Sequence, residues 1–133
     1  MSPKKHLTRV ADRGVAKARL RVSSKYLEAA ELIALDSDPY AVNVCVGIAV
    51  LSGVAAGDAI CIAATGSRYS GPDHTGAAAV LEQVDSDLGA RLRRLVALKP
   101  GSHYGDKLLG ARDRTTALRD AAALVEDAAR RLT

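Results

Sequence analysis

An apolar stretch at residues 41–64, AVNVCVGIAVLSGVAAGDAICIAA, constrains the fold of this chain more than any other feature. A helix of this length is long enough to span a bilayer. Asn43, Ser52 and Asp58 argue against a membrane-spanning helix, because a carboxylate in lipid is costly, and no basic loop brackets the stretch. We therefore expect a central helix, buried on nearly all sides, in a protein without a membrane partner.

The composition is consistent with a single domain built around such a helix. The chain has 133 residues, of which 48% are apolar, and it contains no Phe and no Trp, so small aliphatic side chains must form the core. Gly53 and Gly57 have the spacing that lets helices approach closely, within the chain or across a dimer. Cys45 and Cys61 lack the close spacing of metal ligands. We interpret them as buried hydrophobic side chains in a reducing compartment, and we expect no metal and no cofactor.

Apolar spacing and capping residues predict an all-α, up-and-down bundle of about five helices, and no segment has a convincing strand pattern. Asp38 is the expected N-cap of the second helix, and Asp73 that of the third. The Lys99-Pro100-Gly101 sequence is expected to end the fourth helix, and a loop follows it. The expected helices cover residues 22–35, 39–64, 74–84, 86–98 and 113–132.

Charge divides the chain into a basic N-terminal segment, 1–21, and a bundle, 22–133. Residues 1–21 carry seven basic residues against Asp12, a net charge of +6, so the remaining residues sum to −2 of the total of +4. Such a segment favours an anionic partner such as RNA, and a solvated terminus is the alternative. It is either an arm or a backward extension of the first helix. The candidate nucleic-acid-binding residues are Arg9, Arg13, Lys17, Arg19 and Arg21, of which the first three would share one helix face.

The segment 66–74, GSRYSGPDH, contains the candidate chemical pair. Arg68 and His74 have five residues between them, including Gly71 and Pro72. The alternative interpretation is a turn in which Asp73 caps the next helix and His74 fills its first turn. Asp58 lies in the most apolar helix and needs a partner there, and Arg68 can fold back onto it. Such a pair would hold the loop in place or orient Arg68 towards a phosphate.

The order of these elements resembles the HEPN superfamily, in particular its small actinobacterial-type members, over roughly residues 20–132. The resemblance rests on Gly57-Asp58-Ala59-Ile60 in a long helix, the Arg68 loop entering a helix at Asp73-His74, Lys99-Pro100 followed by His103-Tyr104, and a final Ala/Leu-rich helix. It implies a homodimer and a metal-independent endoribonuclease of the toxin or defence type. Such enzymes use an Arg and a His separated by four to six residues, a spacing that Arg68 and His74 meet.

The chemistry implied by the resemblance assigns a role to each member of the pair. His74 would take the proton of a ribose 2′-hydroxyl, since imidazole titrates near neutrality. Arg68 would place two donors on the phosphorane oxygens. The expected products carry a 2′,3′-cyclic phosphate and a 5′-hydroxyl. Asp58, Asp73, Lys99, His103 and Tyr104 are candidates for supporting or binding roles.

Two further functions stay open. One is a non-catalytic helical module that binds a nucleotide, a nucleic acid or a protein through the basic segment and residues 99–106. The other, implied by a second branch of the HEPN superfamily, is the partner of a minimal nucleotidyltransferase or of an antitoxin, with Tyr104 as a site of adenylylation. The basic start of the chain is not followed by an apolar segment, so no secretory signal is expected and the predicted location is the cytoplasm.

Overall fold

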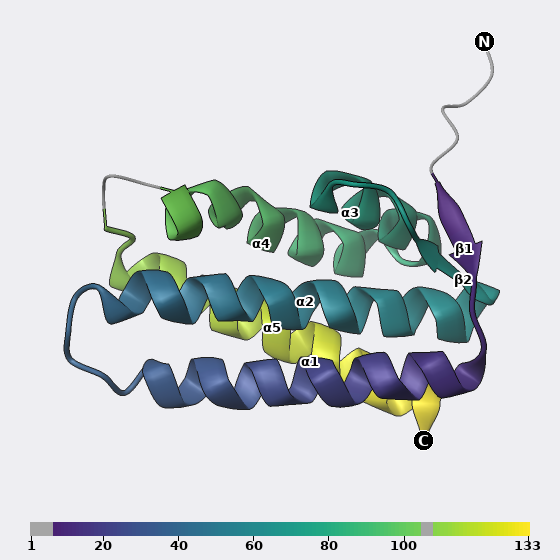
Figure 1. The fold of residues 1–133 in the computed structure, drawn as a ribbon, viewed down its shortest axis with the longest axis horizontal. Helices are drawn as coiled ribbons and strands as arrows, with labels where there is room; N and C mark the ends of the chain where they lie inside the picture. Colours follow the sequence, from purple (N-terminus) through teal and green to yellow (C-terminus); the bar gives the residue numbers. More distant parts are fainter. Residues whose placement is uncertain (1–6, 105–107) are drawn as a thin grey trace, which may run out of the picture.

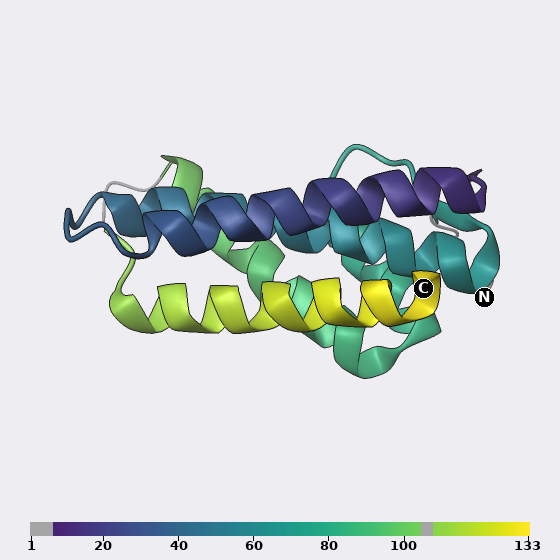
Figure 2. The same ribbon diagram turned by 90° about the horizontal axis from the view of Figure 1, so that it is seen from below.

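Helix α2 runs through the centre of the fold and packs on each of the other four helices (Figure 1). It forms one layer with α1, and α5 lies across from this layer with α4 and the shorter α3 (Figure 2). The computed structural model describes residues 7–102 and 108–133, together with the backbone of residues 103 and 104. The predicted all-α helical bundle is confirmed. Its helices are α1 (Arg13–Ile33), α2 (Ala41–Thr65), α3 (His74–Val84), α4 (Ser86–Tyr104) and α5 (Ala111–Leu132).

The burial of α2 explains its composition. Within the described residues, α2 is the one helix long and apolar enough to cross a membrane, yet 83% of its most apolar 18-residue window is buried inside the bundle. A helix that is apolar on all sides is favourable in this central position, because the other four helices cover its sides. The structure thus shows the central helix that the apolar stretch predicts.

The two glycines of α2 mark the close approach of α4. A Cβ atom at Gly53 would overlap Cδ1 of Leu95, and one at Gly57 would lie 3.1 Å from Cδ2 of Leu92. Both leucines are buried in the core. The two glycines therefore serve packing within the chain, which is one of the two roles that their spacing predicts.

A short antiparallel ribbon, absent from the sequence prediction, joins the start of the chain to the segment after α2. Strand β1 (Thr8–Val10) pairs with β2 (Ser67–Tyr69), with Arg9 opposite Arg68. Gly66 makes the ribbon possible, because it ends α2 in the left-handed conformation, with φ of 79°. Strands of three residues are too short for a period-two pattern to be recognised.

The N-terminal basic segment is divided between two elements. The side chain of Asp12 caps α1, where its Oδ1 accepts a hydrogen bond of 2.9 Å from the amide of Val15. Residues 13–21 therefore extend the first helix backwards, as one of the two alternatives predicts. Arg9 lies in β1, so the expected shared helix face of Arg9, Arg13 and Lys17 is wrong for Arg9.

The start of α2 and the end of α4 differ from those predicted, and α5 begins two residues earlier, at Ala111. Asp38 does not cap α2: its Oδ1 accepts from the amide of Tyr40 in a turn, and α2 begins at Ala41. Helix α4 continues through Pro100 to Tyr104 instead of ending near Leu98. Tertiary contacts extend it there, because Nδ2 of Asn43 on α2 donates to the carbonyl of Gly101 at 3.4 Å.

Candidate anion-binding site

Asp58 is the centre of the candidate site. It lies in the last third of α2, where only 8% of the residue is exposed. Its Oδ2 lies 3.2 Å from a terminal nitrogen of Arg19 on α1 and 3.5 Å from Nη1 of Arg68 on β2. The predicted approach of Arg68 to Asp58 is confirmed, and Arg19 is a second partner that the sequence analysis did not assign to Asp58.

A third arginine joins the site through the ribbon. Arg9 and Arg68 are directly opposite each other, and opposite residues of an antiparallel pair project from the same face. Like charges in such a pair destabilise a sheet unless an anion compensates them. Arg19 and Arg68 thus contact the Asp58 carboxylate, and Arg9 lies beside them on the same face of the ribbon as Arg68. We call Arg9, Arg19, Arg68 and Asp58 the arginine cluster; its formal charge is +2, from three cations and one anion.

Burial and ion pairing act in opposite directions on Asp58. Burial raises the pKa of its carboxyl group above the ordinary value. The charges of Arg19 and Arg68 and their hydrogen bonds to the carboxylate lower the pKa without cancelling the effect of burial. The Nε of Arg19 is buried and is the one described side-chain nitrogen or oxygen of that kind without a hydrogen-bond partner in the protein. The cluster thus holds more donor capacity than its single carboxylate uses.

The loop between β2 and α3 is held by the ring of Tyr69. A Cβ atom at either Gly71 or Gly76 would overlap this ring, so the tyrosine fills a socket that only glycine leaves open at both positions. Beyond the loop, Oδ1 of Asp73 accepts a hydrogen bond of 2.8 Å from the amide of Gly76 and caps α3. The predicted role of Asp73 as an N-cap is confirmed.

His74 is the first residue of α3 and is partly buried. It follows the cap, as the turn interpretation predicts, and it lies in sequence between the two glycines of the Tyr69 socket. The structure therefore places Arg68 in the arginine cluster and His74 at the start of the next helix, with the turn that packs on Tyr69 between them.

The other predicted residues are spread over two helices. Arg13, Lys17 and Arg21 are exposed on α1. Lys99 is partly buried in α4, in a segment that was expected to be a loop and is helical. The side chains of His103 and Tyr104 lie outside the described residues, as do residues 1–6 and 105–107.

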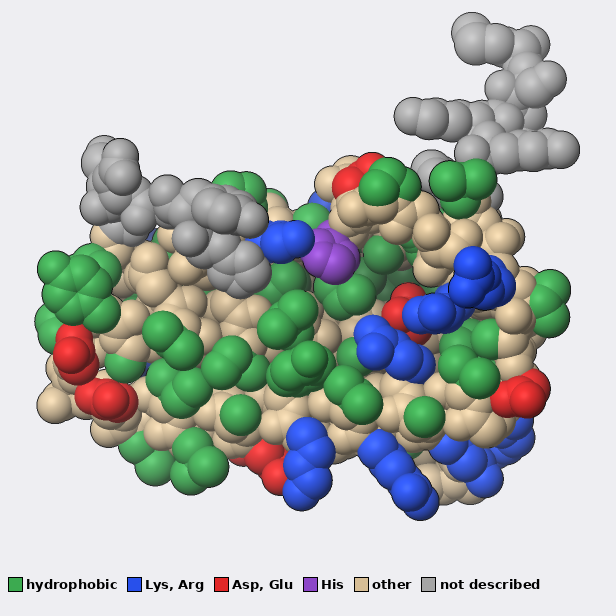
Figure 3. Space-filling model, in the orientation of Figure 1, with side chains coloured by type: hydrophobic (Ala, Val, Ile, Leu, Met, Phe, Trp, Pro, Cys, Tyr) green, Lys and Arg blue, Asp and Glu red, His purple; other side chains and the backbone are tan. Residues whose placement is uncertain are grey.

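Figure 3 shows the charge pattern on one face of the molecule. Lys and Arg side chains gather around an acidic side chain below the ribbon, and acidic side chains stand at the opposite end. That opposite end carries the turn from α1 to α2, where Asp36 and Asp38 are exposed. The described cations of residues 7–21 thus lie along the half of the bundle that holds the arginine cluster.

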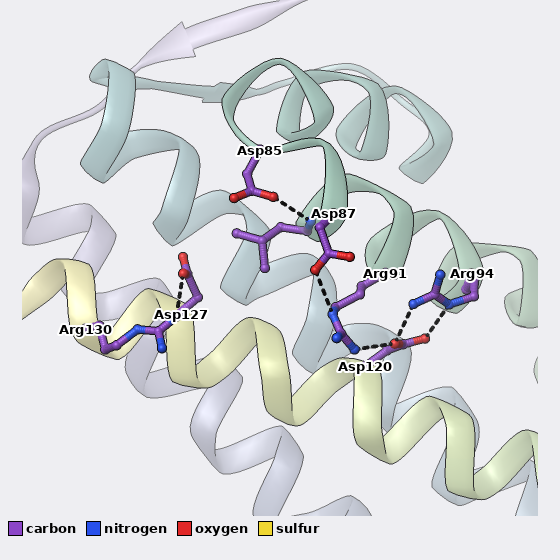
Figure 4. Close-up of polar contacts among 8 residues, drawn as sticks. Asp85, Asp87, Arg91, Arg94, Asp120, Asp127 and Arg130 are labelled. Atoms are coloured by element: carbon purple, nitrogen blue, oxygen red, sulfur yellow. Dashed lines mark hydrogen bonds and ion pairs between the residues drawn. The ribbon is translucent and has the colours of Figure 1, made fainter.

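A second group of arginines, between α4 and α5, differs from the arginine cluster in its balance of charge (Figure 4). Asp120 is 2% exposed and accepts two hydrogen bonds of 3.0 Å from Arg94 and one of 3.1 Å from Arg91. Arg91 also donates to Asp87 at 3.3 Å. Two arginines here meet two carboxylates, so the group is electrically balanced. Its geometry indicates a structural tie between two helices, whereas the arginine cluster carries excess positive charge.

The opposite face of the ribbon borders a cavity of about 590 Å³. Thr8 and Ser67, which neighbour Arg9 and Arg68 and project from the other face, line it together with Gln83 on α3 and Arg131 on α5. Val80 and Val84 supply apolar walls. The lining is thus mainly polar, with Thr8, Thr65, Ser67, Gln83 and Arg131 against three apolar side chains.

The two cysteines are buried, in agreement with their interpretation as small hydrophobic side chains. Cys45 donates to the carbonyl of Ala30 at 3.2 Å. Burial raises the pKa of the Cys61 thiol to about 12, so this thiol is inert at neutral pH. No group of three or more His, Cys, Asp or Glu side chains that could hold a metal ion occurs in the part of the chain that the structure describes.

No model of a known family matches this chain, and no curated protein matches it.

Proposed function

We propose that this protein binds RNA and that the arginine cluster is the site that contacts the phosphates. The proposal rests on two guanidinium groups, of Arg19 on α1 and Arg68 on β2, that contact one buried carboxylate, with Arg9 of β1 opposite Arg68 in the ribbon. Arginine suits phosphate because its fork of donors matches two oxygens at once. Excess positive charge at one end of the molecule also steers a polyanion towards it.

Arg13 and Lys17 of α1 add positive charge near this site. They lie in the two turns of α1 that precede Arg19, and both are exposed. They project from a different face of the helix from Arg19, so they add to the attraction of a polyanion without lining the cluster. The choice of RNA over DNA rests on the resemblance to the HEPN superfamily.

We propose further that Arg68 and His74 cleave the bound RNA without a metal ion, as the HEPN resemblance implies. The ribose 2′-oxygen would attack the neighbouring phosphorus while the bond from phosphorus to the 5′-oxygen breaks. His74 would take the proton of the 2′-hydroxyl, and the leaving 5′-oxygen would receive a proton from solvent or from the imidazolium. Arg68 would stabilise the charge on the phosphorane, using donors that its contact with Asp58 leaves available.

Incubation with single-stranded RNA in EDTA tests both parts of the proposal. Wild type and His74→Ala should bind the RNA equally, and only wild type should release products with cyclic phosphate ends. Arg9→Ala should weaken binding and lower the slope of log K against log salt by about 0.7, the value for one lost phosphate contact on a single strand. Arg112→Ala, which removes an exposed arginine at the start of α5, is the matched control. It should change neither the affinity for RNA nor the slope.

The outcomes separate the candidate functions. Binding without cleavage by well-folded wild type would favour the non-catalytic module, including a partner of a nucleotidyltransferase. Cleavage that His74→Ala retains would remove His74 from the mechanism. Equal losses in Arg9→Ala and Arg112→Ala would show that the attraction is a property of net charge and that the arginine cluster is no specific site.

A further inference from the structure

The cavity on the far side of the ribbon from the arginine cluster is built from the ends of several elements. Its walls come from both strands of the ribbon and from the C-terminal ends of α2, α3 and α5. Figure 1 shows the ribbon and the end of α5 at the same end of the bundle. We call this space of about 590 Å³ the ribbon cavity.

Arg131 is the one cation among the lining residues that the structure describes, and α5 holds it in place. Its Nε donates to Oδ2 of Asp127, one turn earlier, at 2.6 Å. Arg130 binds the other oxygen of the same carboxylate at 2.8 Å (Figure 4). Two cations thus meet one anion, which leaves this group with a charge of +1. Because the Nε of Arg131 is committed to Asp127, its two terminal nitrogens are the donors for a ligand.

Neutral polar groups line the ribbon cavity from the ribbon and from α3. Thr8 and Ser67 project from the face of the ribbon opposite the arginines, and Gln83 lies near the end of α3. The hydroxyl of Thr65 is already committed, because it donates to the carbonyl of Cys61 at 2.8 Å. Hydroxyl and carboxamide groups both donate and accept hydrogen bonds, which suits them to the hydroxyl groups of a ligand.

The composition of the lining narrows the class of ligand. Among the described lining residues none is acidic, so an ammonium group would have no counter-ion. None of them is aromatic either, so a nucleobase would have no ring to stack on. Val80 and Val84 lie one turn apart on α3 and form an aliphatic wall, which suits the C–H groups of a saturated molecule.

We propose that the ribbon cavity binds a small hydroxylated organic oxyanion, of the class of sugar phosphates and sugar acids. The oxyanion lies on the terminal nitrogens of Arg131, since phosphate and carboxylate both match a guanidinium. The hydroxyl groups of the ligand bond to Thr8, Ser67 and Gln83. The volume lies within the range of about 300–1,000 Å³ that is typical of small-molecule sites. The site lies across the ribbon from the arginine cluster, so it does not depend on RNA binding.

A cation fits the ribbon cavity less well than an oxyanion. The C-terminal ends of α2, α3 and α5 carry partial negative charge, which favours positive charge nearby. At α5 this demand is met within the chain, because Arg130 and Arg131 lie in its last turn. At α2 and α3 a terminal carbonyl accepts from the next amide, that of Gly66 and that of Asp85 respectively. The guanidinium of Arg131 would also repel a cation directly.

Isothermal titration calorimetry with ribose 5-phosphate, gluconate and ribose tests the proposal. Wild type should bind ribose 5-phosphate, gluconate or both. It should bind neutral ribose more weakly by about tenfold or more, because ribose has no oxyanion to accept the charged donors. The tighter of the two anions identifies phosphate or carboxylate as the group that the cavity takes.

Two neighbouring arginines provide a matched pair of variants. Arg131→Gln and Arg130→Gln each remove one positive charge and one hydrogen bond to Asp127, but of the two arginines it is Arg131 that lines the cavity. Arg131→Gln should weaken binding of the anion by about tenfold or more, and Arg130→Gln should leave it unchanged. Gln83→Ala changes an exposed residue, so it leaves the core intact, and it should weaken binding several-fold.

The outcomes decide for or against the site. Failure of well-folded wild type to bind either anion overturns the proposal, and so does binding of ribose as tight as that of ribose 5-phosphate. Equal affinities of Arg131→Gln and Arg130→Gln would show that the anion does not lie on Arg131. If circular dichroism shows that Arg131→Gln is unfolded, Gln83→Ala decides: a several-fold loss supports the site, and unchanged binding overturns it.

Discussion

Asp58 shows how one buried carboxylate organises residues that are far apart in the sequence. It holds Arg19 of α1 and Arg68 of β2, at 3.2 and 3.5 Å, on the end of the central helix. The cluster is nevertheless not a balanced structural group like the one at Asp120, because Arg9 adds a third cation. We infer that an anionic ligand would relieve the repulsion between Arg9 and Arg68.

The raised pKa of Asp58 predicts a specific pH dependence of stability. The folded protein binds this proton more tightly than the unfolded chain does, because the folded pKa lies above the ordinary value of 3.8. The contribution of Asp58 to the free energy of unfolding should therefore fall as pH rises from about 3.8 through the raised pKa. The Asp58→Asn variant has no carboxyl group at this position, so its stability lacks this pH-dependent contribution.

Urea unfolding of wild type and Asp58→Asn across this pH window measures the effect. The difference in free energy of unfolding, wild type minus variant, should decrease with rising pH and then level off. Comparison with the variant cancels the opposite contributions of Glu82 and Asp127, whose pKa values are lowered. A difference that grows with pH would mean that the two arginines outweigh burial at this carboxylate.

Among the elements, α2 is the one whose sequence and environment agree most closely. Its length, its apolar character and its two glycines could all be predicted to serve a central position, and they do. The ribbon and the continuation of α4 through Pro100 could not be predicted. The strands are short, and the helical state of residues 99–104 is supported by Asn43, which is more than fifty residues away.

The two glycines of α2 should respond differently to alanine. Gly53→Ala would overlap Leu95, and the cost of overpacking, about 1–3 kcal/mol, should exceed the gain of about 1 kcal/mol in helix propensity. Gly57→Ala meets Cδ2 of Leu92 at 3.1 Å and Cδ2 of Leu81 at an ordinary contact distance of 3.5 Å, so its net effect on stability should be close to zero. Thermal or urea unfolding of both variants checks this order. A Gly53→Ala protein as stable as Gly57→Ala would contradict the close approach of α4 at that point.

At the scale of the whole molecule, one face of the bundle carries a group of basic side chains near the ribbon and acidic side chains at the turn between α1 and α2. The basic end, with the ribbon and the start of α1, carries the arginine cluster, and the turn between α1 and α2 is acidic (Figure 3). The basic character of residues 1–21 could be predicted from composition alone. The pairing of Arg19 with Asp58 could not, because it depends on the register of two antiparallel helices over 39 positions of sequence. The pairing of Arg9 with Arg68 likewise required the ribbon.

Nuclear magnetic resonance titration of the arginine side chains with single-stranded RNA would identify the phosphate-binding residues directly. Each arginine contributes its own Nε–Hε signal, so the signals report which guanidinium groups meet the phosphates. We expect the signals of Arg9, Arg19 and Arg68 to shift first, while those of Arg91 and Arg94, held by Asp120, stay in place. Shifts at Arg91 and Arg94 with none at the arginine cluster would contradict this expectation.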